Sequence, residues 1–176
     1  PYRRDAFGGG DWDYDPDTHT YTFHLEENVQ WHDGQPFTAE DVKFTIEAIM
    51  DPENGSENAP NYEDVEEITV IDDHTVAFRL AAPNVAFLDY MTMAVLPRHL
   101  LEGQDLLATP LARQPVGAGP YKLKEWTTGN RLVLVANPDY CEGRPYIDEV
   151  VVRIIPDQTT QFMELKSGNL DMMGLT

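Results

Sequence analysis

The side chains that could carry acid–base chemistry are carboxylates, which are abundant, and histidines, which are few. The chain has 31 Asp and Glu residues and five His residues among its 176. With so many carboxylates, pairs at suitable spacing arise by chance, and only two carboxyl groups converging at a defined separation would indicate a glycosidase. A carboxylate-dependent hydrolase therefore stays an alternative, and it would require desolvated carboxyl groups with shifted pKa values in a pocket.

The patterns of known nucleophilic and metal sites are missing from the sequence. The histidines form no His-Glu-x-x-His pattern, and neither serine lies in a Gly-x-Ser-x-Gly elbow. Cys141 is the single cysteine, so it can form no disulfide within the chain and no cysteine metal cluster. We expect no catalytic residue, no resident metal ion and no cofactor.

The segment most similar to a metal site is residues 11–17, in which carboxylates alternate as they do in a calcium-binding loop. Such a loop needs glycine at its sixth position and a bidentate glutamate at its twelfth, where this sequence has Pro16 and Thr22. We therefore interpret the segment as a solvated acidic turn. A calcium-dependent interaction module remains a second alternative. A melting temperature that falls when a chelator is added would distinguish it from a protein that binds no metal.

Two glycine-rich segments could bring backbone groups close to a ligand. Residues 8–10 are three glycines without the spacing of a phosphate loop, and we interpret them as a flexible lead-in. Residues 117–120, Gly-Ala-Gly-Pro, turn the backbone sharply before an expected strand. These residues suit either a structural corner or a loop that exposes its backbone to a ligand. We favour the structural corner.

Length and charge limit the classes of protein that fit. A chain of 176 residues can bury one sizeable core, so we expect one domain, or one and part of another. No apolar run approaches the roughly 20 residues of a membrane-spanning helix. The net charge of −19 repels phosphate backbones and anionic headgroups, which argues against nucleic-acid binding and polybasic membrane attachment. Solubility is the explanation that we favour for the acidity. An acidic surface that steers a substrate or adapts the protein to salt stays an open alternative.

The first half of the sequence predicts a strand, a helix and a loop. Residues 18–25 alternate apolar and polar side chains, as a half-buried strand does. Thr38 is a suitable N-cap for a helix that ends at residues 51–52, Asp-Pro, with Val42, Ile46 and Ile49 on its buried stripe. Residues 53–64 are rich in Asn, Glu, Gly and Pro and predict an exposed loop.

Further along, strand pairs alternate with short helices. Turn residues separate apolar runs at 68–71 and 75–80 and again at 121–126 and 131–136, which predicts two hairpins. Short helices are expected at 85–93 and 97–101, a strand at 149–155, a helix at 158–166 closed by Gly168, and the start of a strand from 170. The sequence therefore predicts an α+β fold, in which helices flank an antiparallel or mixed sheet.

Three ordered motifs resemble family 5 of the extracellular solute-binding proteins, which includes peptide- and nickel-binding components of ABC importers. The first is Tyr-Thr-Phe-His-Leu at 21–25 followed by Val-Gln-Trp-His-Asp-Gly-Gln-Pro-Phe-Thr-Ala-Glu-Asp-Val at 29–42. The second is Pro-Val-Gly-Ala-Gly-Pro-Tyr at 115–121, with Ala118 where the family usually has threonine, and then Asn-Pro-Asp-Tyr at 137–140. The third is Leu-Lys-Ser-Gly-Asn-Leu-Asp at 165–171. We interpret most of these residues, the His32-Asp33-Gly34 cluster included, as structural.

The resemblance implies a two-lobed fold of which this chain holds only part. Residues 1–17 would be an acidic, glycine-containing lead-in, and residues 18–176 a partial first lobe reaching the first hinge crossover. The chain starts at Pro1 without a signal segment and ends where a strand starts, so we expect a piece of a longer protein. By position in the family, the residues nearest the ligand would be Val85, Ala86, Phe87, Leu88, Gly119, Pro120, Tyr121, Met172, Met173 and Gly174.

The function implied by the resemblance is capture of a solute for import. The ligand would be a peptide or another small solute, and the full-length protein would deliver it to the permease subunits of an ABC importer. Such a protein is expected to be a monomer and not an enzyme. It would lie outside the cytoplasm, either periplasmic or lipid-anchored at the cell surface.

Overall fold

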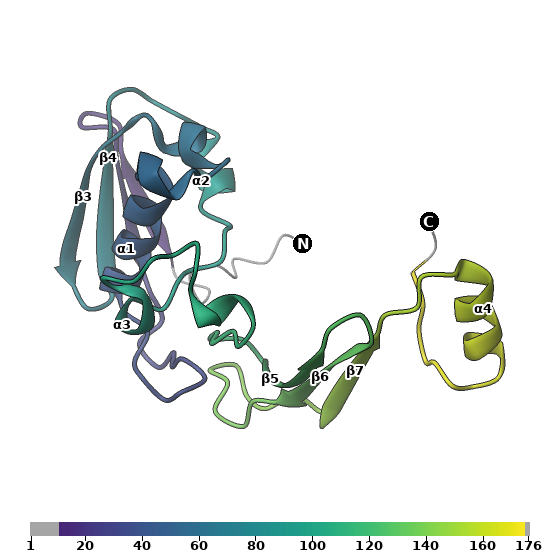
Figure 1. The fold of residues 1–176 in the computed structure, drawn as a ribbon. Helices are drawn as coiled ribbons and strands as arrows, with labels where there is room; N and C mark the ends of the chain where they lie inside the picture. Colours follow the sequence, from purple (N-terminus) through teal and green to yellow (C-terminus); the bar gives the residue numbers. More distant parts are fainter. Residues whose placement is uncertain (1–10, 175–176) are drawn as a thin grey trace.

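The computed structural model describes residues 11–174, which form two antiparallel sheets and several helices (Figure 1). The strands are β1 (Trp12–Asp15), β2 (Thr20–His24), β3 (Val65–Asp72), β4 (Thr75–Leu80), β5 (Tyr121–Thr127), β6 (Arg131–Ala136) and β7 (Glu149–Arg153). The α-helices are α1 (Ala39–Met50), α2 (Phe87–Tyr90), α3 (Arg98–Leu101) and α4 (Gln158–Lys166), with short 3₁₀ turns η2 (Pro52–Asn54), η3 (Ala59–Tyr62) and η4 (Pro110–Ala112). The predicted α+β class is confirmed, and the sheets are antiparallel throughout.

The first sheet has the strand order β1-β2-β4-β3, and α1 covers one of its faces (Figure 1). Alternate residues of β2 and β4 point into the core, as the period of a strand requires. Phe78 is fully buried and packs edge-on against Phe23 at 5.7 Å between ring centroids. Phe87 of α2, 1% exposed, closes this aromatic cluster. We call this part of the molecule, residues 11–112, the acidic unit.

Helix α1 begins and ends where the sequence predicts, with Thr38 as N-cap and Asp51 as C-cap. Val42 and Ile46 are fully buried, and Ile49 packs partly against the same core. The helix is therefore held by its apolar stripe, as an amphipathic surface helix usually is.

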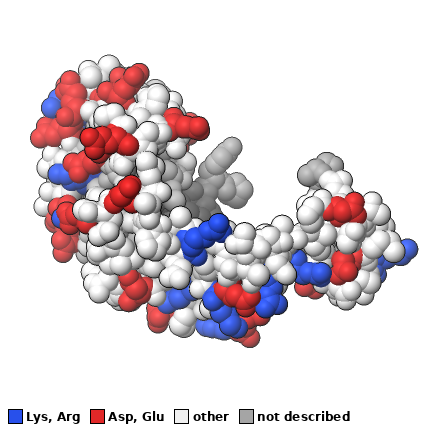
Figure 2. Space-filling view, in the orientation of Figure 1, with Lys and Arg blue, Asp and Glu red and all other residues white. Residues whose placement is uncertain are grey.

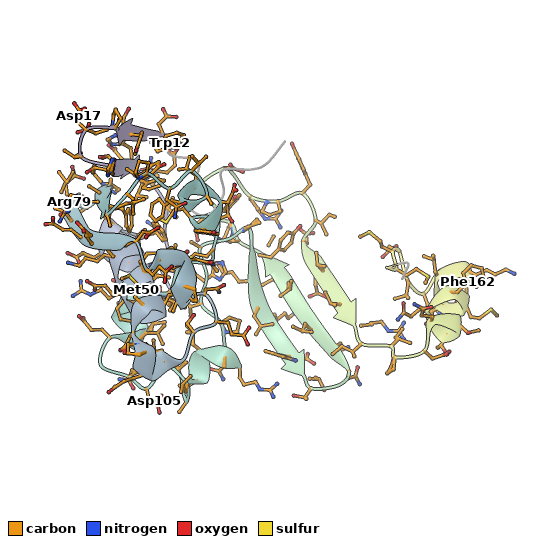
Figure 3. The ribbon with its side chains drawn as sticks, turned by 90° about the horizontal axis from the view of Figure 1, so that it is seen from above. Trp12, Asp17, Met50, Arg79, Asp105 and Phe162 are labelled. Atoms are coloured by element: carbon orange, nitrogen blue, oxygen red, sulfur yellow. The ribbon has the colours of Figure 1, made fainter. Side chains whose placement is uncertain are left out.

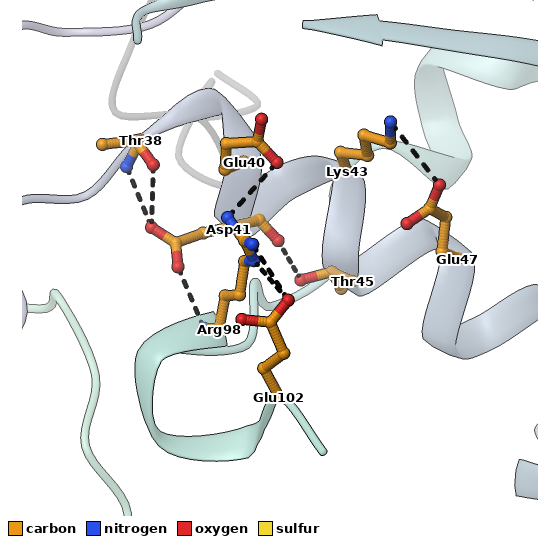
Figure 4. Close-up of polar contacts among 8 residues, drawn as sticks. All are labelled: Thr38, Glu40, Asp41, Lys43, Thr45, Glu47, Arg98 and Glu102. Atoms are coloured by element: carbon orange, nitrogen blue, oxygen red, sulfur yellow. Dashed lines mark hydrogen bonds and ion pairs between the residues drawn. The ribbon is translucent and has the colours of Figure 1, made fainter.

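The carboxylate of Asp41 ties the start of α1 to neighbouring segments (Figure 4). Its Oδ2 atom accepts hydrogen bonds from the backbone N–H of Thr38 at 2.9 Å and from Nε1 of Trp31 at 3.2 Å. Its Oδ1 atom accepts from the backbone N–H of Arg98 at 2.9 Å, at the start of α3. Asp41 is only 4% exposed, so these donors replace the water that the carboxylate loses.

The second sheet has the order β5-β6-β7 and buries much less. Val133 of β6 is 5% exposed, whereas Val151 and Val152 of β7 are each 46% exposed. No residue of α4 is buried. In both ribbon views this sheet lies between the acidic unit and α4 (Figures 1 and 3).

Charge is divided unequally between the two parts of the chain. Residues 11–112 contain 22 acidic and 3 basic residues, a net charge of −19, whereas residues 113–166 contain 7 of each. Figure 2 shows acidic side chains spread over the acidic unit, with Lys and Arg gathered toward the three-stranded sheet. Within the described residues, no helix is both long and apolar enough to cross a bilayer.

The structure corrects several expectations. Trp12–Asp15, expected in the lead-in, form β1, because their backbone pairs with β2 and the tilted rings of Tyr14 and Tyr21 lie 4.5 Å apart between centroids. The loop at 53–64 is not wholly exposed: Tyr62 is 2% exposed and donates to the carbonyl of Tyr90 at 2.7 Å. Burial raises the pKa of Tyr62 to about 12.

Three smaller differences concern the ends of elements. The helix expected at 85–93 is only the single turn α2, and β7 ends two residues earlier than expected. Residues 170–174 form no strand. The glycines at 8–10 lie outside the described residues.

Candidate functional site

The Gly-Ala-Gly-Pro segment is a corner whose backbone groups are held by His32. The backbone N–H of His32 donates to the carbonyl of Gly117 at 2.7 Å. The ring completes the contact: Nδ1 lies 3.1 Å from the N–H of Gly117, and Nε2 lies 3.0 Å from the carbonyl of Gly119. This favours the structural corner over a loop that offers its backbone to a ligand. We call residues 117–121 the glycine corner.

Asn137 holds the other side of the glycine corner. Its side chain donates to the carbonyl of Gly119 at 3.1 Å, and its backbone N–H donates to the carbonyl of Pro120 at 2.8 Å. Asn137 is 2% exposed, and its Oδ1 accepts from the N–H of Asp139 at 3.1 Å. The asparagine of the Asn-Pro-Asp-Tyr motif therefore joins the end of β6 to the start of β5.

Residues 85–88, the first candidate ligand segment, sit on the core of the acidic unit. Asn84 anchors them: its carbonyl accepts from the hydroxyl of Tyr21 at 3.1 Å, and its Oδ1 accepts from the N–H of Ala86 at 3.0 Å. Val85 is 89% exposed, whereas Phe87 is 1% exposed and Leu88 packs partly against the core. The side chain of Phe87 therefore belongs to the core, and Val85 is the exposed side chain of this segment; that the segment contacts a ligand stays a prediction.

The second and third candidate segments lie in different surroundings. In the glycine corner, Pro120 is exposed, and the hydroxyl of the half-buried Tyr121 donates to the carbonyl of Ile147 at 3.3 Å. Met172 is 83% exposed, Met173 is half-buried and Gly174 is exposed. They follow α4, which both ribbon views place at the opposite end of the molecule from the acidic unit (Figures 1 and 3).

The first candidate segment packs on the core of the acidic unit, and residues just before the second segment pack on the same core. Leu88 packs on the core cluster, and so do Val116 and Ala118, which precede residues 119–121. The segment 172–174 is not brought to it. Three open grooves in the described part of the chain are lined by other residues than these segments.

The sequence did not reveal one of these grooves. This groove has a volume of about 610 Å³ and lies between His32 and β5. The guanidinium of Arg113 lies 4.8 Å from the ring centroid of Trp126, a cation–π contact, and Lys122 and Lys124 also line the groove. The alternation of the two lysines along β5 was a signal for a shared face, but nothing local placed Arg113 beside it.

Within residues 11–174, the titratable groups do not gather into a cluster suited to acid–base or metal chemistry. Five described carboxyl groups have a clearly shifted pKa, and in each the pKa is lowered; for Asp157 and Glu125 the main cause is a hydrogen bond from a threonine hydroxyl. A hydrolase acid would need the opposite shift. Within residues 11–174 no three His, Cys, Asp or Glu side chains are arranged to hold a metal ion, at 11–17 or elsewhere.

Cys141 lies in the loop between β6 and β7 and is exposed and free. The pKa of its thiol is raised, first by partial desolvation and also by the charge of Glu142. A raised pKa lowers the fraction of thiolate at neutral pH, so the residue is poorly suited to be a nucleophile.

Comparison with known proteins agrees with the three motifs. The family model for bacterial extracellular solute-binding proteins, family 5 Middle, matches residues 10–176. The oligopeptide-binding protein AppA of Bacillus subtilis is 33% identical over 161 residues, which cover 88% of this chain and 30% of AppA.

Solved structures show the same fold. NikZ from Campylobacter jejuni, in complex with Ni(L-His), matches with a TM-score of 0.86 and 34% identity over 91% of this chain and 32% of NikZ. AppA from Bacillus subtilis, in complex with a nonapeptide, matches with a TM-score of 0.84 and 31% identity over 91% of this chain and 33% of AppA. The chain thus spans about a third of the length of these relatives. It belongs to family 5 of the bacterial extracellular solute-binding proteins.

Proposed function

We propose that the chain is part of the first lobe of the substrate-binding component of an ABC importer, which captures peptides or related solutes outside the cytoplasmic membrane. The family match over residues 10–176 carries the proposal. It is supported by the fold shared with proteins solved with a nonapeptide and with Ni(L-His) bound. The proposed protein is a monomer and not an enzyme, it is periplasmic or lipid-anchored, and its partners are the permease subunits.

In this proposal, ligand capture works by closure of two lobes around the solute. A ligand stabilises the closed state only if it makes contacts there that the open state lacks. In this chain such contacts would come from the exposed Val85, from residues 119–121 and from residues 172–174. Because the chain spans about a third of its relatives, the site would be completed by the rest of the protein.

The test compares the full-length protein that contains this segment with the 176-residue chain alone. Each is titrated calorimetrically with dipeptides, tripeptides, nonapeptides and Ni²⁺ with L-histidine, and melting curves are recorded in parallel. A ligand at a hundredfold excess over its Kd stabilises the folded state by about 2.7 kcal/mol, so the full-length protein should melt at a higher temperature with its ligand. If no compound of the panel binds the full-length protein, peptide capture is refuted. If the 176-residue chain alone binds a peptide with micromolar Kd, the proposal that this chain holds only an incomplete site is refuted.

Two matched substitutions localise the site. Val85→Asp places a carboxylate in the candidate ligand segment, and Ile71→Asp places one on β3, at a residue that is 59% exposed. We expect Val85→Asp to weaken ligand binding by the full-length protein roughly tenfold or more, about 1.4 kcal/mol, and Ile71→Asp to leave it unchanged. Equal ligand affinities of the two variants would show that Val85 is not part of the binding site.

A further inference from the structure

His32 makes four hydrogen bonds to a segment that lies more than 80 residues away in the sequence. Three involve the glycine corner: the backbone bond to Gly117 and the two ring contacts to Gly117 and Gly119. In the fourth, the carbonyl of His32 accepts from Nζ of Lys122 on β5 at 3.1 Å. The residue thus joins the acidic unit to the first strand of the three-stranded sheet.

The partners of the ring determine which form of the imidazole fits. A backbone carbonyl can only accept, so Nε2 must carry a hydrogen toward Gly119. A backbone N–H can only donate, so Nδ1 must present a lone pair to Gly117. Only the neutral Nε2–H tautomer satisfies both contacts. A proton on Nδ1 would point at the N–H of Gly117 and turn that hydrogen bond into a contact between two donors.

The ring packs closely against the glycine corner. A Cβ atom at Gly117 would lie 3.3 Å from Cε1 of His32, so the glycine allows a closer approach than a side chain would. Trp31, the preceding residue, is 3% exposed in the core. The buried Trp31 thus anchors the backbone next to the ring, while the ring itself borders the open groove beside β5.

The groups around His32 favour its neutral form. Burial is the main cause that lowers the pKa of His32, and the ammonium of Lys122 on β5 lowers it further. The hydrogen bond to Gly119 and the charge of Asp33 act in the opposite direction. Asp33 is itself bound by Nε2 of His99 on α3, at 2.7 Å, and Asp139 beyond β6 lies 4.0 Å from Nζ of Lys122.

We propose that His32 is a pH-sensitive clasp, which holds the glycine corner against the acidic unit while it is neutral and releases the corner when it is protonated. Through Asn137, which bonds to both Gly119 and Pro120, release would reach the joined ends of β5 and β6. His32 is then a positioning residue for Gly119, Pro120 and Tyr121. Any effect that release of the corner has on ligand binding rests on the proposed function. The clasp itself involves no ligand and does not depend on that function.

The first test follows the ring and the corner by NMR of the ¹⁵N-labelled chain, without solute, from about pH 8 to about pH 5. We expect the neutral Nε2–H tautomer of His32 at pH 8 and a titration midpoint below the ordinary value of about 6.5. The amide signals of Gly117 and Gly119 should shift with the same midpoint. The proposal would be overturned if the ring were the Nδ1–H tautomer or cationic at pH 8. It would also be overturned if the amide signals of the two glycines did not change as His32 titrates.

The second test measures urea unfolding at about pH 7.5 and about pH 5.5 for the wild type, His32→Gln and His24→Gln. Because the pKa of His32 is lower in the folded state, its contribution to stability is complete above about pH 6.5 and is lost as pH falls through the folded-state value. Acidification should therefore lower the urea midpoint of the wild type more than that of His32→Gln. The control variant His24→Gln changes an exposed histidine and should respond like the wild type. Comparing variants cancels the change in charge repulsion common to all three. An equal response of all three would contradict the clasp, and if His32→Gln does not fold, the NMR test on the wild type still decides.

Discussion

At the scale of single residues, Asp41 shows how a charged side chain can be buried without being catalytic. Its carboxylate meets donors from three segments: Thr38 before α1, Trp31 in the preceding turn and Arg98 at α3. The motif that includes Asp41 is thus explained by architecture. A polar side chain with this many backbone and indole partners determines a local structure more than it provides chemistry.

Removing this carboxylate should destabilise the chain strongly. In Asp41→Ala the N–H of Arg98 and the indole N–H of Trp31 lose their partner, and each buried donor without one costs roughly 1–3 kcal/mol, so we expect a loss of about 3 kcal/mol in the free energy of unfolding. Glu40→Ala is the matched control, since Glu40 is a half-exposed neighbour paired with Arg98 at 3.4 Å, and it should cost less than about 1 kcal/mol. Urea unfolding followed by far-UV circular dichroism gives both values. Similar losses in the two variants would show that the buried carboxylate has no special role.

At the scale of elements, the two sheets differ in how much they bury. Strand β4 lies between two neighbours in the first sheet and buries Val76, Phe78 and Leu80, whereas the exposed face of β7 and the whole of α4 have little cover. Local opening is easiest where few apolar contacts must be broken.

Hydrogen exchange of the chain should follow this difference. We expect the amides of β4 and α1 to exchange slowest, those of β5 to β7 faster, and those of α4 fastest, because each step has less buried apolar surface to lose. Mass spectrometry of peptic peptides after timed exchange in D₂O measures the order. Protection of α4 as strong as that of α1 would contradict the expectation.

The elements also show what a sequence can predict. Helix α1 was predictable because its signals are local: Thr38 before it, Asp51 and Pro52 after it, and an apolar stripe at helical spacing. Strand β1 was missed because its alternating carboxylates suggest a turn, while the reason for the strand, pairing with β2 and stacking on Tyr21, lies in tertiary structure.

The candidate site was predictable only in part, for the same reason. The resemblance indicated the glycine corner, but Gly117 lies 85 residues from His32, and no local pattern reports their contact. The position of Phe87 in the family likewise says nothing of which way its side chain points, and only the structure shows that it is buried in the core.

At the scale of the whole molecule, the acidic unit carries the net charge. Its 22 acidic residues far outnumber its 3 basic residues, and the repulsion among the carboxylates opposes the compact state. The repulsion acts over a Debye length of about 30 Å at about 10 mM salt and is screened to a few Å near 1 M.

Added salt should therefore stabilise the chain. We expect the urea midpoint to rise when NaCl is increased from about 10 mM to about 500 mM, since most of the repulsion between exposed carboxylates is then screened. Glu57→Gln and then Glu57→Lys, at an exposed residue, should each raise the midpoint at low salt and reduce the rise with NaCl. A midpoint independent of salt in the wild type would mean that the acidity costs no stability.

The free Cys141 gives the molecule a built-in reporter of its own geometry. The thiol is exposed on the loop between β6 and β7, while Trp12 and Trp31 belong to the acidic unit. A single dye attached to that sulfur at mildly alkaline pH, where its raised pKa still leaves thiolate to react, would accept energy from these two indoles once Trp126 on β5, which lies on the dye's side of the glycine corner, is replaced by Phe. The natural sequence thus contains both ends of a spectroscopic ruler across the clasp, and no further cysteine has to be introduced or removed to read it.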